Sequence, residues 1–423
     1  MIDLRRVQID PDGLITQDQR GMMLRVPLPP ATVEALGTDP LGGLRSLAKA
    51  DNGLARVLDG SVPPRIEAAM DRVNFLPRPL RVYYGLEPRC NLKCPYCGPR
   101  DFHGMGSPVD PAWEMYLLGQ IAAAGAFQVQ LTGGEIGIRG FDLLPVLERA
   151  AELGLAVLFS TNGVWNCIDK KDEFMTELAR FNNIIQSKIS IEGTLEFHDS
   201  VRGEGTYAAA VETLAKLSHA GLNPRISTTI FAENCNSRQL RHLASLAKTY
   251  RAGFQPIPMR PVGRASSLTL RAPTTEQLAA YTKELTELRA AERQPISFNF
   301  DIIQPTHDVP VFDVHHSASC GASMWGVHVT HRGEVYPCGF AQEINGGVTF
   351  LSGQITPEVS LLDIWLNSQV LASVRDAGKS EKCQACGHYG HGCWGGCWVM
   401  GWHATGRVSG MDSYCFVDSL PPA

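Results

Sequence analysis

The chain has 423 residues, of which 44% are hydrophobic and 19% are charged, and its formal net charge is -5 at pH 7. These proportions are typical of a globular protein with room for two or three domains, and they argue against nucleic-acid binding. No run of about 18 apolar residues indicates a membrane span, and the charged N-terminus MIDLRRVQIDPDG lacks the apolar core of a signal peptide.

The twelve cysteines are unevenly distributed. Ten of them fall into two groups, at 90–97 and 320–415. The other two, Cys167 and Cys235, are interpreted as ordinary core thiols. Disulfide scaffolds are usually short, with cysteines spread along the chain. The grouping therefore predicts metal ligation in a reducing compartment, and we expect a cytoplasmic protein.

Residues 1–80 form a predicted N-terminal module without a catalytic motif. Leu4–Asp10 and Gly21–Val26 are predicted as two strands of a hairpin around a Pro-Asp-Gly turn, followed by short helices near 40–58 and 64–73. A hairpin plus helices is the make-up expected of a leader-peptide recognition domain. A family-specific cap without a binding role is the alternative.

Strand and helix patterns alternate from residue 81 to residue 270. Apolar or β-branched runs recur at about thirty residues, the length of a βα unit, with amphipathic segments between them. Six such units predict an α/β fold: a partial (β/α)6 barrel whose ligand site lies at the carboxyl ends of the strands. The predicted strands are 82–87, 127–131, 156–160, 186–191, 225–230 and 254–258, and the predicted helices include 111–124, 141–153, 206–220 and 237–250.

A bridging region is predicted at 271–317. It begins with a helix over 273–293, for which Thr274 or Thr275 is the expected N-cap. A loop at 304–317 follows the helix and contains Asp308 and Asp313. The apolar face of the helix is formed by Leu278, Tyr281, Leu285 and Leu288.

Cys90, Cys94 and Cys97 lie in one loop directly after the first strand of the predicted barrel. Thiolates are soft ligands that select zinc or iron–sulfur clusters. A closed zinc site needs four ligands, and no fourth cysteine follows nearby. A [4Fe–4S] cluster held by three thiolates leaves one iron open to another ligand. The alternative is three cysteines that share a loop by chance.

The loop resembles the signature of the radical S-adenosylmethionine (SAM) enzymes, Cys-x3-Cys-x2-Cys with an aromatic residue, here Tyr96, before the last cysteine. The resemblance implies that the amino and carboxylate groups of SAM chelate the open iron. One electron, from a flavodoxin or ferredoxin, then cleaves SAM to methionine and a 5′-deoxyadenosyl radical that abstracts a substrate hydrogen.

The resemblance also assigns SAM contacts to the ends of later strands. Gly133-Gly134-Glu135 is expected at the amino group of SAM, where glycine allows close backbone approach, and Asn162 is expected at the ribose. Relatives usually have Asp where Glu192 stands. For Arg260 and Arg264 a structural ion pair is as good an interpretation. The expected SAM-binding residues are Tyr96, Gly133, Gly134, Glu135, Ser160, Asn162, Ser190, Glu192 and Arg264.

The second cysteine group, within 318–423, resembles the SPASM domain, an extension of some radical SAM enzymes that holds auxiliary [4Fe–4S] clusters. Gly333 stands five residues before Cys338, and a Cys-x2-Cys-x6-Cys-x3-Cys run with a distal cysteine follows. The resemblance implies one cluster on Cys383, Cys386, Cys393 and Cys415 and another on Cys320, Cys338 and Cys397. The alternative is a zinc ribbon made from two close cysteine pairs.

The set Cys320, Cys338 and Cys397 contains only three thiolates. One iron of that cluster is therefore expected to be open to a substrate thiolate, an amino group, water or a ligand from elsewhere in the chain, with His388 and His391 as conceivable substitutes. In sulfatase-maturing relatives an Asp base directly follows the second cysteine of this domain. Gly339 stands there in this chain, which disfavours sulfatase maturation.

Together with the two resemblances, these features predict an enzyme with SAM and three [4Fe–4S] clusters. We expect it to modify a ribosomally made peptide oxidatively, by cross-linking, in an enclosed site. One alternative is a radical SAM dehydrogenase, epimerase or decarboxylase acting on a sugar or amino acid. Another is an electron-transfer protein without catalysis. Glu192, Asp308 and Asp313 are the candidate general bases.

Overall fold

A computed structural model describes ten stretches of the chain. The helices predicted near 40–58 and 64–73, the loop at 304–317 with Asp308 and Asp313, and both His388 and His391 lie outside the described residues. The described residues are 2–10, 13–18, 23–27, 78–98, 109–267, 270–291, 318–344, 349–377, 380–387 and 393–415.

The start of the chain forms a three-stranded antiparallel sheet of β1 (Ile2–Asp10), β2 (Gly13–Asp18) and β3 (Met23–Pro27). β1 pairs with β2, and β2 pairs with β3. The predicted direct hairpin between the first and last of these segments is therefore wrong. The middle segment carries Ile15 and Thr16, whose branched side chains favour a strand, and the hairpin prediction leaves this strand out.

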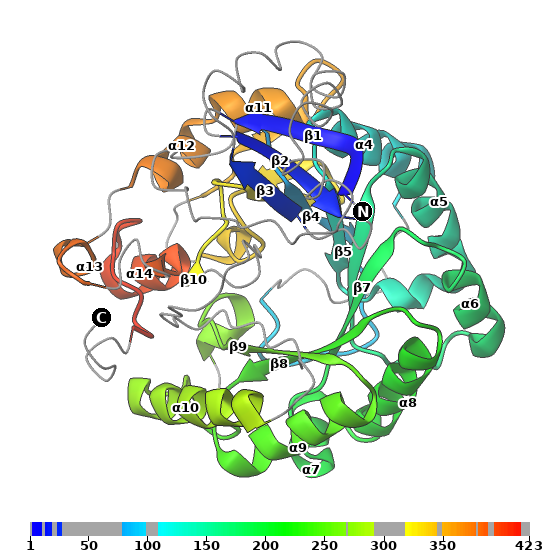
Figure 1. The fold of residues 1–423 in the computed structure, drawn as a ribbon, viewed down its shortest axis with the longest axis vertical. Coiled ribbons are helices and arrows are strands. Elements are labelled where there is room, and N and C mark those ends of the chain that lie inside the picture. The colour runs from blue at the N-terminus through cyan, green and yellow to red at the C-terminus, as the bar shows by residue number, and fades with distance from the viewer. Residues whose placement is uncertain are drawn as a thin grey trace, which may run out of the picture.

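A nine-stranded sheet forms the centre of the molecule, in the order β13-β12-β11-β4-β5-β6-β7-β8-β9 (Figure 1). Strands β4 to β9 run parallel to one another, as expected when helices connect successive strands. All six predicted barrel strands are confirmed: β4 (Arg81–Glu87), β5 (Gln128–Gly133), β6 (Ala156–Thr161), β7 (Ile184–Ser190), β8 (Pro224–Ile230) and β9 (Gly253–Pro258).

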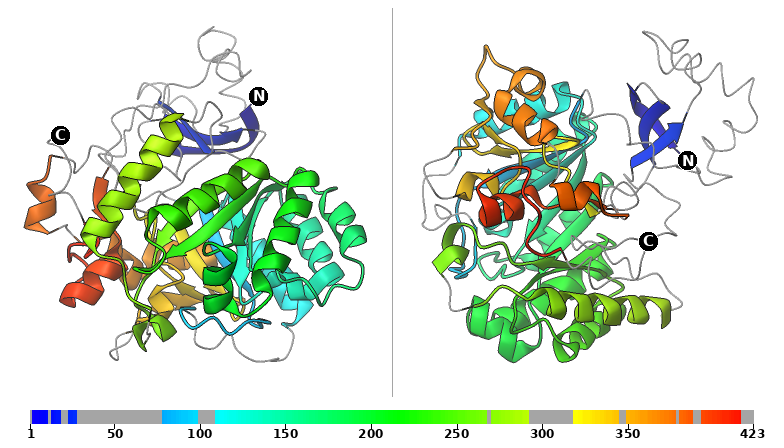
Figure 2. Two further views of the ribbon diagram at one scale, coloured as in Figure 1. Left: turned by 90° about the horizontal axis from the view of Figure 1, so that it is seen from below. Right: turned by 90° about the vertical axis from the view of Figure 1, so that its left-hand side faces the viewer.

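Helices cover the outer face of this curved sheet (Figures 1 and 2). Residues such as Val82, Leu131 and Phe159 are fully or almost fully buried between sheet and helices. The predicted helix at 141–153 begins later, because a 3-10 turn, η1 (Ile136–Leu143), precedes it and contains Gly140 at φ 53. The helices are α4 (Pro111–Ala123), α5 (Leu144–Glu152), α6 (Lys171–Leu178), α7 (Leu195–Arg202), α8 (Thr206–His219) and α9 (Ser237–Thr249).

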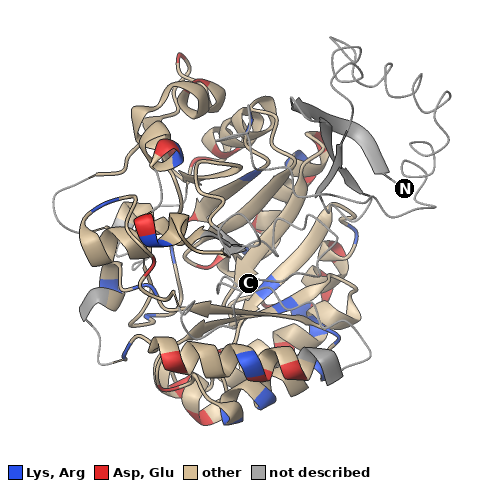
Figure 3. Ribbon diagram, turned by 60° about the vertical axis from the view of Figure 1, so that its left-hand side comes forward, with Lys and Arg blue, Asp and Glu red and all other residues tan. Residues whose placement is uncertain are grey.

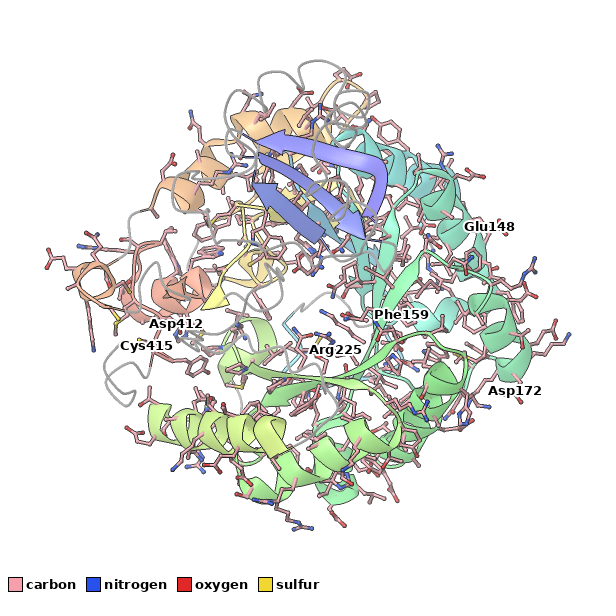
Figure 4. All side chains as sticks on the ribbon, viewed as in Figure 1. Glu148, Phe159, Asp172, Arg225, Asp412 and Cys415 are labelled. Atoms are coloured by element: carbon pink, nitrogen blue, oxygen red, sulfur yellow. The ribbon has the colours of Figure 1, made fainter. Side chains whose placement is uncertain are left out.

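The inner face of the sheet is polar although it is buried. Successive side chains of a strand point to opposite faces, so the residues that alternate with the apolar core face the interior. These include Gln130, Lys188, Arg225 and Gln255, each less than a tenth exposed, and Figure 4 labels Arg225 at the inner side of the strands. Gln130 donates to the Ser160 hydroxyl at 3.0 Å and accepts from Lys188 at 3.4 Å. Such an interior is suited to a polar ligand rather than to a sealed apolar core.

The cysteine-rich region is joined to the barrel through the same sheet. β11 (Gly326–Thr330) pairs in parallel with β4, while β12 (Glu334–Tyr336) and β13 (Gly353–Gln354) continue the sheet in antiparallel fashion. The indole N–H of Trp113 donates to the His331 carbonyl at 3.1 Å, and the Tyr116 hydroxyl donates to the Thr356 carbonyl at 2.8 Å. The six-stranded barrel thus gains a seventh parallel strand from the C-terminal region.

The predicted bridging helix is confirmed as α10 (Thr275–Ala291). Thr274 caps it: its hydroxyl accepts from the Gln277 N–H at 3.2 Å, and the Gln277 side chain accepts from the Thr274 N–H at 3.0 Å. Leu278, Tyr281 and Leu285 are buried as expected. A short 3-10 turn, η2 (Gly263–Ser267), follows β9. The smaller elements of the C-terminal region are β10 (Ala318–Ser319), η3 (Ala341–Glu343), α11 (Leu361–Asn367), α12 (Gln369–Asp376), α13 (Glu381–Gln384), β14 (Cys393–Gly396) and α14 (Trp398–Thr405).

Charged residues of both signs are interspersed along the helices in Figure 3. This distribution agrees with the near balance of acidic and basic residues in the sequence. Within the described part of the chain, no helix is both long enough and apolar enough to cross a membrane.

A chain that ends at residue 317 would lack β11 and leave the backbone groups of the β4 edge unpaired. We expect this truncated chain to aggregate, or to unfold at a lower denaturant concentration than the full chain. Size-exclusion chromatography and denaturant titration measure both outcomes.

The matched control for this truncation is the full chain with every cysteine from Cys320 to Cys415 changed to Ser. It keeps the strands and should stay monodisperse. A stable monomeric truncation would contradict the structural role of β11.

Candidate iron–sulfur and SAM site

The loop after β4 gathers Cys90, Cys94 and Cys97. Cys94 is buried, and the other two are partly buried. The Leu92 N–H donates to the Cys90 sulfur at 3.4 Å, and the Cys97 N–H donates to the Cys94 carbonyl at 3.3 Å. Burial raises the pKa of Cys90 to about 12, and the neighbouring thiols add to the rise. Crowded thiolates need a positive partner, which an iron–sulfur cluster provides.

The end of β5 packs directly on this loop through two glycines. The Gly134 N–H donates to the Glu87 carbonyl at 2.6 Å, and the Glu135 N–H donates to the Arg89 carbonyl at 2.8 Å. A Cβ atom on Gly133 would overlap the Glu87 carbonyl, and one on Gly134 would overlap the Arg89 carbonyl. The SAM contact expected of these glycines stays a prediction, and in the structure both glycines seat the cysteine loop.

Glu135 fastens the end of β5 to the end of β6. Its buried carboxylate accepts from the N–H groups of Gly137 at 2.7 Å and Asn162 at 2.5 Å, from the Thr161 hydroxyl at 2.6 Å and from the Trp165 indole at 3.2 Å. Burial raises the pKa of this carboxyl, although the hydrogen bonds act in the opposite direction. All of these donors come from the two strand ends beside the cysteine loop.

Asn162, the expected ribose contact, reaches back to the cysteine loop. Its side-chain N–H donates to the Asn91 side chain at 2.8 Å and lies 3.9 Å from the Cys90 sulfur. Asn91 in turn donates to the Val164 carbonyl at 2.7 Å. Sequence analysis missed Asn91, whose only signal was its position directly after the first cysteine.

Glu192, which follows β7, binds Tyr96 of the cysteine loop. It accepts from the Tyr96 hydroxyl at 2.7 Å, from the Arg202 guanidinium at 2.7 and 2.9 Å, and from the Thr229 N–H at 2.6 Å. The Arg202 guanidinium also lies over the Tyr96 ring, 5.6 Å from its centre. Burial alone would lower the pKa of Arg202, but Tyr96 and Glu192 raise it far above its usual value. Sequence analysis missed the role of Arg202.

Residues after β9 close over the far end of the loop. Arg264 hydrogen-bonds to Cys97 and partly offsets the rise that burial causes in the pKa of that thiol. A Cβ on Gly263 would overlap the Gly98 carbonyl, and φ of Gly263 is 59. Arg260 lies over the Phe340 ring at 5.3 Å and so connects the barrel to the C-terminal region.

A buried ion-pair network holds the start of the loop. Glu87 accepts from Arg89 at 2.8 and 2.9 Å and from Arg139 at 2.8 Å, and Arg139 also pairs with Glu114. Burial alone would raise the pKa of Glu87, but the hydrogen bonds from Arg89 and the charge of Arg139 lower it. The sequence does not predict this network, because Glu114 and Arg139 lie far from Glu87 and Arg89 along the chain.

Cys320, Cys338 and Cys397 come together in the C-terminal region. All three pack on one apolar cluster that includes Trp398 and Val262, the latter from the segment after β9. Burial and the charges of the other two thiols raise the pKa of Cys338. The Trp398 indole N–H is buried and has no hydrogen-bond partner among the described residues, so it suits a cluster sulfur atom.

The other expected auxiliary ligands lie nearby in the same region. Cys383 is buried on α13, where the Ser380 hydroxyl accepts from its N–H at 3.3 Å. The Cys415 N–H donates to the Asp412 carbonyl at 3.0 Å, and the Asp412 side chain accepts from the Cys397 N–H at 2.8 Å, as Figure 4 shows for the neighbouring Asp412 and Cys415. Cys386 follows α13, and the side chain of Cys393 lies outside the described part.

Among the described residues, no three His, Cys, Asp or Glu side chains converge tightly enough for a single metal ion. A cubane cluster needs wider spacing, because each thiolate binds a different iron atom. The set of three cysteines in the loop after β4 and the set of three in the C-terminal region each have buried hydrogen-bond donors beside them, and both sets fit such clusters.

Comparison with known proteins agrees with this geometry. The radical SAM superfamily matches residues 86–237, and the SPASM iron–sulfur cluster-binding domain matches residues 320–387. Mycofactocin maturase MftC of Mycobacterium tuberculosis is 27% identical over 85% of this chain and 88% of its own length. PqqA peptide cyclase of Methylorubrum populi is 25% identical over 82% of this chain and 87% of its own length.

Among solved structures, Streptococcus suis SuiB bound to S-adenosylmethionine superposes with a TM-score of 0.72. The two chains are 17% identical, and the match covers 98% of this chain and 99% of SuiB. This likeness supports the barrel with its C-terminal extension as one shared fold.

The fold and the cysteine loop define a radical SAM enzyme. More particularly, the chain belongs to the radical SAM enzymes that carry a C-terminal SPASM domain, and it binds SAM and iron–sulfur clusters.

Changing Gly134 to Ala should displace the cysteine loop, because the new methyl group meets the Arg89 carbonyl. We expect the reconstituted variant to lose about four irons, those of one [4Fe–4S] cluster, while the other iron remains. Iron analysis and visible absorption measure the loss.

The control for Gly134→Ala is Gly119→Ala in α4, where a Cβ meets nothing within 4 Å. It should keep all its iron and gain about 0.5–1 kcal/mol of stability from the better helix former. Full iron content in Gly134→Ala would refute the seating role of that glycine.

Changing Glu192 to Ala leaves the Arg202 guanidinium buried without its carboxylate. We expect the free energy of unfolding of the apoprotein to fall by about 3–5 kcal/mol, as for other broken buried pairs. Tyr96→Phe removes only one hydrogen bond and should cost about 1 kcal/mol. Denaturant titration compares the two variants, and equal losses would contradict the central position of Glu192.

Proposed function

We propose that this enzyme reductively cleaves SAM, abstracts a hydrogen atom from a ribosomally made peptide and oxidatively modifies that peptide by cross-linking two of its residues. The observation that carries the proposal is the seating of the cysteine loop on the ends of β5, β6 and β7, with a polar interior beside it. The peptide substrate is supported by relatives whose names denote a maturase and a peptide cyclase. SuiB was also solved bound to its precursor peptide SuiA.

In this proposal Cys90, Cys94 and Cys97 are catalytic and hold the [4Fe–4S] cluster that supplies the electron for SAM cleavage when it is bound. The chain's own residues position the cluster and SAM relative to each other. Tyr96 is fixed by Glu192, and the expected SAM-binding residues lie around the cysteine loop at four strand ends. These residues are Tyr96, Gly133, Gly134, Glu135, Ser160, Asn162, Ser190, Glu192 and Arg264.

Two auxiliary [4Fe–4S] clusters complete the proposed set of three. Their role is to take up the electron that leaves the substrate when a new bond forms, which makes the net reaction an oxidation. The ligand sets are Cys320, Cys338 and Cys397 for one cluster and Cys383, Cys386, Cys393 and Cys415 for the other.

The remaining parts of the proposal concern partners and organisation. A cytoplasmic flavodoxin or ferredoxin donates electrons, and the N-terminal module at 1–80 binds the leader of the peptide. The barrel at 81–270, the bridging region at 271–317 and the domain at 318–423 enclose the reacting groups.

The test begins with iron and sulfide analysis of anaerobically reconstituted protein. Wild type should hold about twelve irons, and the variant with Cys90, Cys94 and Cys97 changed to Ala should hold about eight. A control variant, Cys167→Ala with Cys235→Ala, should keep about twelve. Wild type with about four irons together with zinc would overturn the redox role of the C-terminal domain.

The second stage adds SAM, dithionite and synthetic peptides translated from short reading frames that flank the gene. We expect 5′-deoxyadenosine from wild type but not from the three-cysteine variant. One peptide should lose two hydrogen atoms per cross-link, as measured by mass spectrometry. Turnover of free sugars or amino acids without any peptide product would refute the peptide substrate.

A further inference from the structure

His328 on β11 is a buried histidine that the function described so far does not use. Its side chain is 4% exposed, and neither ring nitrogen has a hydrogen-bond partner among the described residues. Burial lowers the pKa of the imidazole to about 4, so the ring is neutral near pH 7. A buried polar ring with both nitrogens unpaired is costly unless something binds it.

The ring lies where the barrel meets the cysteine-rich region. Its Nε2 edge faces Gly85 of β4: a Cβ there would be 3.4 Å from the ring Cε1 and 3.5 Å from Nε2. Its Nδ1 edge faces Gly339, where a Cβ would be 3.5 Å from Nδ1. Neither glycine has a side chain that can satisfy the ring.

The Nδ1 edge therefore faces the segment that begins with Cys338, one of only three thiolates expected at its cluster. Gly339 directly follows that cysteine, and Cys320, Cys338 and Cys397 all pack on the same apolar cluster. Imidazole is an established replacement for thiolate on iron–sulfur clusters, where it raises the reduction potential. A neutral ring is the form that binds metal.

We propose that His328 is the fourth protein ligand of the cluster held by Cys320, Cys338 and Cys397, and that it binds through Nδ1. It closes the iron that three thiolates leave open, so that this cluster serves electron transfer and does not bind substrate. The proposal extends the assignment of auxiliary clusters and does not depend on the identity of the substrate.

The test uses the variant with Cys90, Cys94 and Cys97 changed to Ala, which keeps only the auxiliary clusters. After anaerobic reconstitution and reduction with dithionite, pulsed EPR should detect a ¹⁴N nucleus directly coupled to a cluster. Labelling the protein with ¹⁵N-histidine should convert this signal to that of ¹⁵N. Adding His328→Ala should remove it while about eight irons remain.

Two further samples make the result decisive. Adding ¹⁵N-imidazole to the His328→Ala protein should restore a nitrogen coupling with the ¹⁵N pattern, because the small ring enters the vacated site. His331→Ala is the matched control, since His331 lies just beyond β11 and is only partly buried. It should leave the coupling unchanged.

The outcomes separate this proposal from the proposed function. The parent is the variant with Cys90, Cys94 and Cys97 changed to Ala. If the parent shows no nitrogen coupling, or if the coupling survives His328→Ala, ligation by His328 is overturned and the peptide proposal stays intact. If His328→Ala does not fold, His328→Cys replaces it: a fourth thiolate should retain the iron without the nitrogen signal. A parent variant without iron overturns the auxiliary clusters and the ligand assignment together.

Discussion

The contact on which the rest of the site depends is the close approach of two backbones, the end of β5 and the loop that follows β4. Two hydrogen bonds join them, from the Gly134 and Glu135 N–H groups to the Glu87 and Arg89 carbonyls. Only glycine leaves room for this approach. Because the loop carries Cys90 next to this contact, the position of the thiols is fixed by the parallel register of β4 and β5.

The same strand, β4, pairs on its other edge with β11, and this shared strand couples the two cluster regions. The carboxyl end of β4 continues into the cysteine loop, while β11 continues through β12 to Cys338. Relative movement of the regions would require breaking main-chain hydrogen bonds within a sheet, unlike the sliding of two separate domains. The spacing between the cysteine loop after β4 and the Cys338 segment after β12 is therefore set by sheet geometry.

Sequence periodicity predicted the barrel well because each strand and helix carries its own local pattern, and the cysteine spacing is a local signal too. It did not predict β11 as a barrel strand, since that pairing joins segments more than two hundred residues apart. It did not predict β2, which lies between the two strands expected to form a direct hairpin. Asn91, Arg202, Arg139 and His328 are single polar residues without a motif, and only the tertiary structure shows which segments each of them contacts.

Three buried carboxylates, those of Glu87, Glu135 and Glu192, lie at the carboxyl ends of β4, β5 and β7, yet their surroundings argue against any of them acting as a base. Each already accepts hydrogen bonds on both oxygens, from arginine, from backbone N–H groups or from hydroxyls. A base must be able to receive a proton from substrate, and these oxygens face the protein's own donors. Their work is to fix the cysteine loop and Tyr96 before SAM arrives, so that little reorganisation is left for the reaction itself.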